Sequence, residues 1–267
     1  AVKRENHRNG FDFTFSAPKS VSLLALVGGD KRLMAAHDNA VKFALSQIEQ
    51  DAAQAKQTDP ASKATLFENT GNLLFAMVRH KTSRESDPQL HTHSLTANMT
   101  RDSEGRLRAL ASSFKQKGGV INGTGERVYN HQKYYTSLYQ STLARSVEQM
   151  GYQTRALGNN LFEVEGVPQD LLDTFSTRSQ QINEQTQSMG VDSQAAKDVA
   201  AKDTRKSKTY HSEEALSKQW QDKADNNEFS LTGFISERMA LDKSPQEIAL
   251  KPAAIDAVSR AINHASN

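Results

Sequence analysis

The sequence predicts an α+β fold, in which strands and helices are mixed in the first part of the chain and helices alone make up the last part. Three features predict it: an alternating apolar and polar run near the start, two strand-like segments in the middle, and a change to polar, helical composition near residue 168. We therefore divide the 267 residues into a core, 1–167, and a helical subdomain, 168–267. This length exceeds that of an average domain and suits a core with an accessory subdomain.

The first predicted elements are a strand and two helices. Residues 11–16 read Phe-Asp-Phe-Thr-Phe-Ser. Because successive side chains of a strand point to opposite faces, the three Phe share one face and Asp12 lies on the other. A helix follows at residues 18–26, with serine and proline at its start and two glycines after its end. An amphipathic helix then occupies residues 31–54, and the polar residues 55–65 predict a loop.

The middle of the chain predicts two strands around a charged turn. Residues 72–78 form a nearly continuous apolar run, which is typical of a strand buried on both faces. Residues 81–88 predict the turn, and residues 90–100 the second strand. The remaining predicted elements are a hairpin turn at 102–105 leading into a strand at 106–110, a helix at 127–150 and a strand at 161–165.

Composition limits the kinds of partner and site. The net charge is +2, from 33 basic and 31 acidic residues, so a nucleic-acid partner must be met by local basic patches. Without cysteine, any metal must be bound by His or carboxylate groups, and a reducing, cytoplasmic location is expected. No apolar run approaches the ~20 residues of a membrane-spanning helix, so we expect no membrane insertion.

A histidine cluster is the main candidate site. His80 ends one predicted strand, and His91 and His93 share a face at the start of the next. If the two strands are neighbours, the three imidazoles converge on one divalent metal ion, and imidazole ligands alone do not select among Mg, Mn, Zn and Ni. Their face continues as Leu95 and Met99, which predicts a site at the rim of an apolar core. The alternative is three unrelated polar residues near strand ends.

Two further groups lie near the first strand. A carboxylate such as Asp12 often orients a metal-bound His through its second ring nitrogen, or takes a proton; the alternative is an ordinary strand carboxylate. Lys19, Ser20 and Ser22 begin the first helix, where backbone N–H groups and the helix dipole attract an anion such as phosphate. Plain helix capping explains them equally well.

A basic cluster in the C-terminal part suits a phosphate backbone, although a solvated helix face is a common alternative. Its members are Lys197, Lys202, Arg205, Lys206 and Lys208. Trp220 and Tyr210 have aromatic rings that stack on bases in single-strand binding proteins, and core packing is an equal alternative.

The amino-acid sequences of several motifs resemble those of the TrwC/TraI-type (MobF) conjugative relaxases. The resemblance extends from about residue 9 to about residue 222, and the motifs follow the family's order. They are Phe13-Thr-Phe-Ser-Ala-Pro-Lys-Ser-Val-Ser22, His80-Lys-Thr-Ser-Arg84, Asp87-Pro-Gln-Leu-His-Thr-His93, Gly151-Tyr152, Phe175-Ser-Thr-Arg-Ser179 and Asp203-Thr-Arg-Lys-Ser-Lys208.

The resemblance implies an HUH-type endonuclease with two layers, a central antiparallel sheet and flanking helices, closed by a C-terminal helical lid over single-stranded DNA. Such an enzyme nicks one strand at a plasmid transfer origin when a tyrosine attacks the scissile phosphate, giving a 5′-phosphotyrosine. By motif position, His80, His91 and His93 are the metal ligands and Asp12 is the carboxylate beside the tyrosine. Arg84 and Arg178 are implied DNA contacts, and the same reading adds Lys19.

The implied setting is the bacterial cytoplasm, with relaxosome and type IV secretion coupling proteins as partners and a monomeric relaxase. The family's nucleophilic tyrosines lie upstream of every motif matched here, and no tyrosine precedes Tyr129. The chain is therefore expected to lack the nucleophile. Tyr134-Tyr135 falls in the middle of a predicted helix and is interpreted as a pair of packing aromatics.

Two other functions stay open from the sequence. One is a catalytically silent single-strand binding module with the same fold. The other is a metallohydrolase with a metal-bound water, since H-x-H motifs occur in such enzymes. Against the hydrolase, the chain lacks the eight strand–helix units of a barrel, is too helical for a cupin and offers no evident bridging carboxylate.

Overall fold

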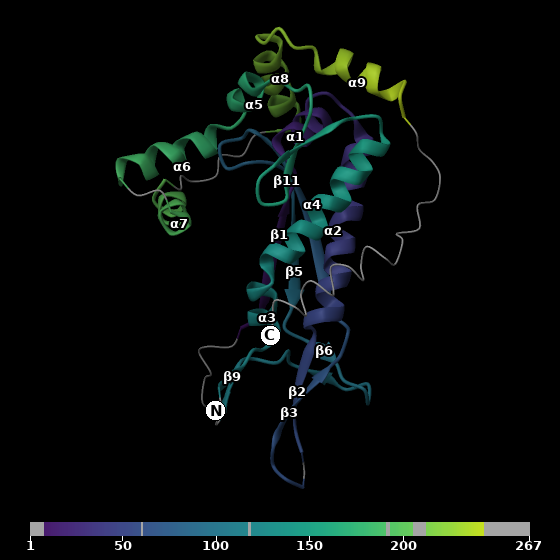
Figure 1. Ribbon diagram of the computed structural model, residues 1–267, viewed down its shortest axis with the longest axis vertical. Helices are drawn as coiled ribbons and strands as arrows, with labels where there is room; N and C mark the ends of the chain where they lie inside the picture. Colours follow the sequence, from purple (N-terminus) through teal and green to yellow (C-terminus); the bar gives the residue numbers. More distant parts are fainter. Residues whose placement is uncertain (1–7, 60, 117–118, 191–192, 205–211, 243–267) are drawn as a thin grey trace.

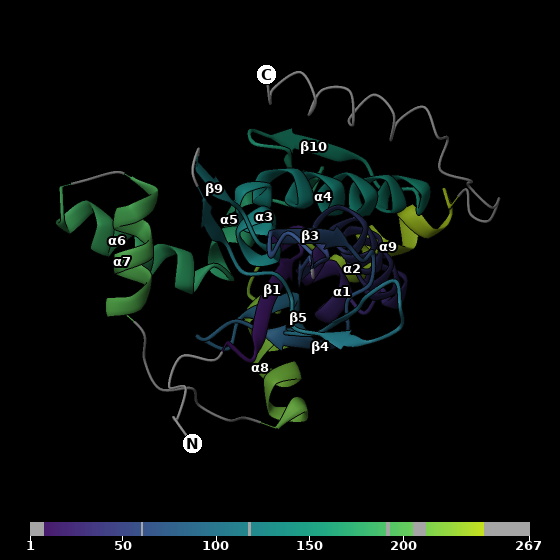
Figure 2. The ribbon, with the colours of Figure 1, turned by 90° about the horizontal axis from the view of Figure 1, so that it is seen from below.

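The computed structural model describes residues 8–59, 61–116, 119–190, 193–204 and 212–242. Its centre is an antiparallel sheet of three strands in the order β1-β5-β4, with helices on one face (Figures 1 and 2). The strands are β1 (Gly10–Ser16), β4 (Phe75–Thr82) and β5 (Pro88–Ala97), and the covering helices are α2 (Lys31–Ala52) and α4 (Gln132–Gln149). The predicted α+β class, with a central antiparallel sheet and flanking helices, is confirmed.

Short strand pairs and further helices surround this centre. The antiparallel pairs are β2 (Gln54–Thr58) with β3 (Thr65–Asn69), β6 (Thr100–Arg101) with β7 (Leu107–Arg108), β8 (Phe114–Gln116) with β9 (Gly119–Ile121), and β10 (Thr154–Leu157) with β11 (Leu161–Val164). The other helices are α1 (Lys19–Leu26), α3 (Thr124–Asn130), α5 (Gln169–Thr174), α6 (Thr177–Ser188), α7 (Gln194–Asp203), α8 (Glu213–Asp225) and α9 (Leu231–Met239). Figure 1 shows β2 and β3 at one end of the molecule and α8 and α9 at the other.

The loop predicted at residues 55–65 is wrong, because β2 and β3 pair there in an antiparallel hairpin. Backbone hydrogen bonds hold this hairpin, and they do not require apolar side chains. Its first residues are also buried, since Ala55 forms a bridge with Leu110 and has no exposed surface. The polar composition of residues 55–65 was therefore misleading, because a polar segment can also form a strand pair.

The strand predicted at residues 72–78 is shifted and is not buried on both faces. It occupies residues 75–82, so the turn that follows begins only at Ser83. β4 is the last strand of the three-stranded sheet, where side chains have a strand neighbour on one side only. Met77 and Val78 accordingly keep 43% and 44% of their surface exposed.

The buried face of β5 is the polar one, which corrects the expectation that the histidines lie at the rim of an apolar core. Thr92, Ser94 and Thr96 are buried beneath the helices, whereas Leu95, on the histidine face, is 49% exposed. His37 of α2 is the polar partner of Thr92 on this face. Its Nε2 lies 2.8 Å from Thr92 Oγ1 and its Nδ1 lies 2.7 Å from the Tyr139 hydroxyl oxygen, so a polar strand face meets a polar helix residue.

The apolar core continues across residue 168. Leu171 of α5, Phe175 directly after it, Trp220 of α8 and Phe234 of α9 belong to the same cluster as buried residues of α1 and α2. In contrast, α6 and α7 pack against each other and lie beside the rest of the molecule (Figures 1 and 2). The boundary at residue 168 stays a prediction, and the α6–α7 pair is the part that stands apart. No helix within the described ranges is long and apolar enough to cross a membrane.

We predict that His37 makes the stability of the fold depend on pH. Burial, together with the nearby Arg79 charge and His91, lowers the pKa of His37 from 6.5 to about 4. The unfolded chain therefore binds more protons than the folded chain between about pH 6.5 and pH 4, so stability falls as the pH is lowered through this window, by up to about 1.4 kcal/mol per pH unit. Urea unfolding of His37→Gln should show a shallower dependence over the same window than wild type. The exposed His131→Gln is the control, and equal slopes in wild type and His37→Gln would contradict the prediction.

Candidate metal centre

The register of two strands brings the histidines together. His80 of β4 lies directly opposite His91 of β5, and His93 lies two residues further along on the same face. The ring centroids of His80 and His91 are 5.2 Å apart, those of His80 and His93 5.1 Å, and those of His91 and His93 5.3 Å. One ring nitrogen from each comes within 4.8 Å of the others, and all three side chains are partly buried.

Hydrogen bonds to the second ring nitrogen orient two of these rings. His91 Nδ1 lies 3.0 Å from the backbone oxygen of Gln89, and His93 Nδ1 lies 2.8 Å from Asp12 Oδ2 and 3.1 Å from Thr14 Oγ1. Because a carbonyl and a carboxylate oxygen only accept, both Nδ1 atoms carry the proton. Nε2 of each ring is thereby assigned as the metal-binding atom.

The geometry fits a divalent metal ion with open coordination positions. Three imidazoles from paired strands form one side of such a site, and the exposed sheet face leaves the other side to substrate. No other group of three potential ligands within the described ranges comes as close together. A bound ion would act as a Lewis acid towards an oxygen placed on that face.

The comparisons with known proteins decide the family. Residues 1–227 match the TrwC relaxase family. The chain belongs to this family. It is 42% identical over 230 residues to the multifunctional conjugation protein TraI of Escherichia coli strain K12, covering 85% of this chain but 12% of that relative. The chain thus spans a small part of the curated relatives that it matches.

Solved structures of TrwC carry the same fold. A metal-free complex of the conjugative relaxase TrwC with oriT DNA superposes with a TM-score of 0.76 at 36% identity, covering 86% of this chain and 78% of that chain. A metal-bound TrwC complex with oriT DNA gives a TM-score of 0.74 at 37% identity, over 85% of this chain and 74% of that chain. A copper-bound TrwC complex gives a TM-score of 0.74 at 37% identity, over 84% and 73%.

Asp12, the predicted partner of a ligand histidine, lies beside the triad in this relaxase-family chain. β1 pairs with β5 so that Thr14 lies opposite His93, and the Asp12 side chain reaches the same ring from one pleat further along. Its side chain is 44% exposed, so one carboxylate both orients His93 and meets the open face. Thr14 was missed, although its place two residues after Asp12 puts it on the same strand face.

The anion expected at the start of α1 is provided by the protein itself. The Glu163 carboxylate of β11 accepts hydrogen bonds from the backbone N–H groups of Lys19 and Ser20, at 3.2 Å and 2.8 Å, and from the Ser20 hydroxyl. Ser22 donates to the Pro18 carbonyl. The described contacts thus agree with helix capping, here by a carboxylate, which was the alternative to phosphate binding at this helix start.

The Lys19 side chain is directed towards β5. Its Nζ donates to the Pro88 carbonyl oxygen at 3.0 Å. Burial lowers the pKa of Lys19 to about 8, against the opposing effect of the Asp87 and Glu163 charges. A DNA contact by Lys19 stays a prediction. In the structure its ammonium group donates a hydrogen bond to the first residue of β5.

Within the described residues, the other predicted DNA contacts lie on the α6–α7 pair and in the turn between β4 and β5. Arg178 ties α6 to α7, since its guanidinium donates to the carbonyl oxygens of Ala201 and Thr204. Lys202 is exposed on α7, and Lys197 is partly buried there. Arg84 lies in the turn between β4 and β5. Arg205, Lys206, Lys208 and Tyr210 lie outside the described residues.

The aromatic candidates are packed in the protein. Trp220 is 6% exposed and its Nε1 donates to the Ser86 carbonyl oxygen at 2.7 Å. Tyr135 is 4% exposed, and its hydroxyl lies 3.5 Å from Asp51 Oδ2. Burial raises the pKa of Tyr134 and Tyr135, which disfavours the phenolate. These positions agree with packing aromatics.

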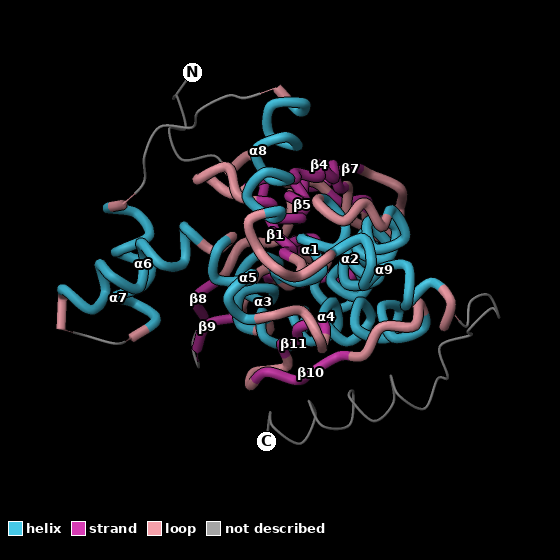
Figure 3. Tube along the Cα trace, turned by 90° about the horizontal axis from the view of Figure 1, so that it is seen from above, coloured by secondary structure: helices cyan, strands magenta, loops and turns pink. Residues whose placement is uncertain are grey.

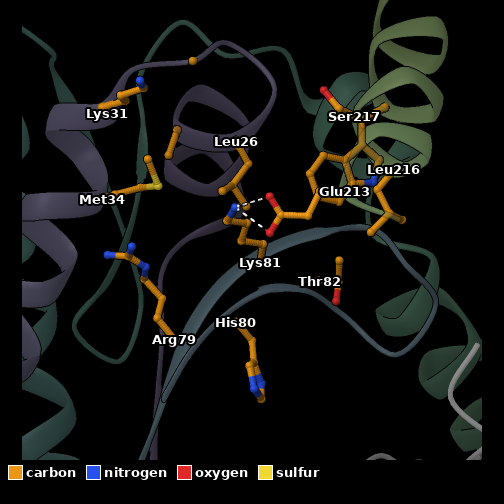
Figure 4. A pocket seen from close by; sticks show the side chains of 13 residues that line it. Leu26, Lys31, Met34, Arg79, His80, Lys81, Thr82, Glu213, Leu216 and Ser217 are labelled. Carbon is orange, nitrogen blue, oxygen red and sulfur yellow. Dashed lines mark hydrogen bonds and ion pairs between the residues drawn. The ribbon is translucent and has the colours of Figure 1, made fainter. Parts of the chain in front are cut away.

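A cavity that the sequence did not predict lies next to His80. It has a volume of about 450 Å³ and is bordered by the starts of α2 and α8, the end of α1 and β4. Lys81 and Glu213 form an ion pair across it, while the His80 ring points away towards the opposite face of β4 (Figure 4). Trp220 also lines this cavity.

We predict one divalent metal ion per chain at His80, His91 and His93. Replacing one of the three ligands removes an imidazole from the coordination sphere and leaves two donors, which hold the ion less tightly. Elemental mass spectrometry after dialysis should find the ion in wild type and little of it in His91→Ala. His131→Ala, an exposed histidine outside the cluster, should keep full occupancy. Equal metal content in wild type and His91→Ala would overturn the assignment.

Proposed function

We propose that this protein is the relaxase part of a conjugation system, which holds single-stranded transfer-origin DNA for strand-specific nicking. The observation that carries the proposal is the triad of His80, His91 and His93 with Asp12 on His93. It is supported by membership of the TrwC relaxase family and by TrwC structures that contain oriT DNA. Nicking, the relaxosome and secretion partners and the monomeric state belong to this proposal.

The reaction is a transesterification in which atoms and charge balance. A tyrosine oxygen forms a bond to the scissile phosphorus, the bond from phosphorus to the 3′-oxygen breaks, and the 3′-oxygen takes a proton to become a hydroxyl. His80, His91 and His93 would hold the metal ion, which would supply Lewis-acid stabilisation of charge on the phosphate oxygens. The protein holds His91 and His93 in the ligand tautomer, and Asp12 is the proposed catalytic residue, placed to accept the tyrosine proton.

Single-stranded DNA would cross the open face of the central sheet. This face carries the triad, and Val78 and Leu95 beside it are 44% and 49% exposed, so apolar surface is available to bases next to a phosphate site. The exposed Lys202 on α7 is the clearest of the proposed backbone contacts. The other proposed contacts to the DNA backbone are Arg84, Arg178, Lys19, Arg205, Lys206 and Lys208.

None of the tyrosines in the helix α4 fits the nucleophile. Tyr135 and Tyr139 are buried, and burial raises the pKa of both, while Tyr134 packs against Tyr135. The second candidate function is a single-strand binding module, which is supported by the burial of Tyr135 and Tyr139. Membership of the relaxase family favours both functions over a metallohydrolase.

We predict that the 267-residue chain binds a transfer-origin oligonucleotide without cutting it. The histidines and Asp12 would hold a phosphate, but Tyr135 and Tyr139 are buried in the core, and the exposed Tyr129 belongs to α3 rather than to the strands that carry the triad. An end-labelled 27-mer with the TrwC recognition hairpin and cleavage site, and its TraI counterpart, should be retained by the metal-loaded protein and stay intact on a denaturing gel. Strand-specific nicking would instead locate the nucleophile within this chain, and Tyr129→Phe, Tyr134→Phe and Tyr135→Phe would identify it.

A second prediction places the scissile phosphate at the metal centre. A neutral methylphosphonate at that phosphate removes a charged oxygen and should weaken binding to metal-loaded wild type about tenfold, the order expected for one charge-assisted contact. In His91→Ala the same substitution should have little effect. A methylphosphonate two nucleotides away is the control. Equal losses in wild type and His91→Ala would show that the strand binds elsewhere, as a simple binding module would allow.

A further inference from the structure

The turn that joins the two histidine-bearing strands is held by its surroundings. Residues 83–87 link β4 to β5, and backbone hydrogen bonds from Ser83 to Asp87 and from Ser86 to Ser83 close the turn. Ser86 adopts a left-handed backbone conformation, with φ of 63°, which residues other than glycine rarely adopt. Such a conformation persists where neighbouring structure fixes it.

Helix α8 provides that neighbouring structure, and it lies next to the ends of β4 and β5 (Figure 3). Trp220 Nε1 donates to the Ser86 carbonyl at 2.7 Å. Lys223 Nζ lies 3.4 Å from Asp87 Oδ1, and Glu213 pairs with Lys81. Three side chains of one helix therefore hold the turn and the β4 residue that follows His80.

Asp87 connects the turn to a second helix. It is 5% exposed, and its Oδ2 accepts the backbone N–H of Thr177, the first residue of α6, at 2.9 Å. A buried carboxylate needs such partners, because an uncompensated charge is costly in the interior. The Asp87 side chain therefore links the turn to both α6 and α8 through hydrogen bonds and an ion pair.

Helix α1 holds the β5 side of this hairpin end, since Leu90 N donates to Ser22 Oγ and Lys19 Nζ donates to the Pro88 carbonyl, both at 3.0 Å, whereas the turn and the β4 side are held by the polar contacts with α8 and α6. The 450 Å³ cavity lies between β4 and the starts of α2 and α8 (Figure 4), so side chains do not fill the space behind Arg79 and Lys81. A β-bulge falls between His80 and Thr82, where the regular ladder is interrupted. Helix α8 itself is anchored, since Trp220 and Ala224 belong to the main core.

A short covalent path joins the turn to a metal-binding ring. Asp87 is followed by Pro88 and Gln89, and the Gln89 carbonyl oxygen accepts a hydrogen bond from His91 Nδ1. We propose that α8 positions the histidine hairpin, with Trp220 and Lys223 acting as positioning residues through Ser86 and Asp87. This proposal rests on the metal centre proposed above and assigns to the helices after residue 168 a role in its geometry.

The test uses Cu²⁺ as the probe, because imidazole binds it well and its electron paramagnetic resonance spectrum reports ligand geometry. In Trp220→Phe, which removes one hydrogen bond and keeps an aromatic ring, Cu²⁺ should bind about tenfold more weakly, as for other groups that orient ligands. The copper spectrum should change as well. Tyr152→Phe is the matched control, since it also removes one buried hydrogen bond, to Asp30, away from the hairpin.

A second pair of variants covers the case in which Trp220→Phe does not fold. Lys223→Gln removes the contact with Asp87, and Lys218→Gln makes the same change at an exposed position of α8. We expect weaker Cu²⁺ binding and an altered spectrum only in Lys223→Gln. Spectra and affinities that match the controls in both test variants would overturn the positioning role while leaving the metal centre intact. Absence of Cu²⁺ binding in wild type would overturn the metal centre and this proposal together.

Discussion

The antiparallel pairing of β5 with its two neighbours, β4 and β1, is the constraint on which the candidate site depends. His80 faces His91 across this pair, and β1 pairs with the other edge of β5 so that Thr14 faces His93. Because side chains alternate along a strand, a slip of one residue would move one histidine to the helix side and separate the triad. The pairing with β1 places Asp12 beside His93, so the ligands and their orienting group are fixed by the backbone hydrogen bonds on the two edges of β5.

That register is selected by burial on the opposite face. Phe15 lies opposite Thr92 and packs in the core, and His37 bonds Thr92 from α2. A slip would bring an imidazole of the triad into this interior and leave His37 without its acceptor or donor, which costs about 1–3 kcal/mol for an unsatisfied buried group. The hydrogen bond from His37 to Thr92 thus keeps Thr92 on the buried face of β5, and because side chains alternate it keeps His91 and His93 on the open face.

The sequence alone was sufficient for the triad because its spacing is local. His91 and His93 share a face by strand alternation, and His80 ends a segment that the apolar run indicated. The burial of Thr92 was not predictable in this way, since its partner His37 lies 55 residues away. The contact of Trp220 with Ser86 spans 134 residues, and the Glu163 carboxylate reaches Ser20 over 143. Contacts at such distances depend on packing that no local pattern records.

The continuity of the core across residue 168 bears on how members of this family exchange parts by recombination. Leu171, Phe175 and Trp220 contribute to the same core as α1 and α2, so a crossover at residue 168 would join surfaces that had not evolved together. The α6–α7 pair packs mainly within itself, and Arg178 closes it with hydrogen bonds to Ala201 and Thr204. Only an exchange of the pair alone, with a crossover on each side of it, leaves the contacts among Leu171, Phe175 and Trp220 in place. Such an exchange must also keep the bond from the Thr177 N–H to Asp87 in the β4–β5 turn.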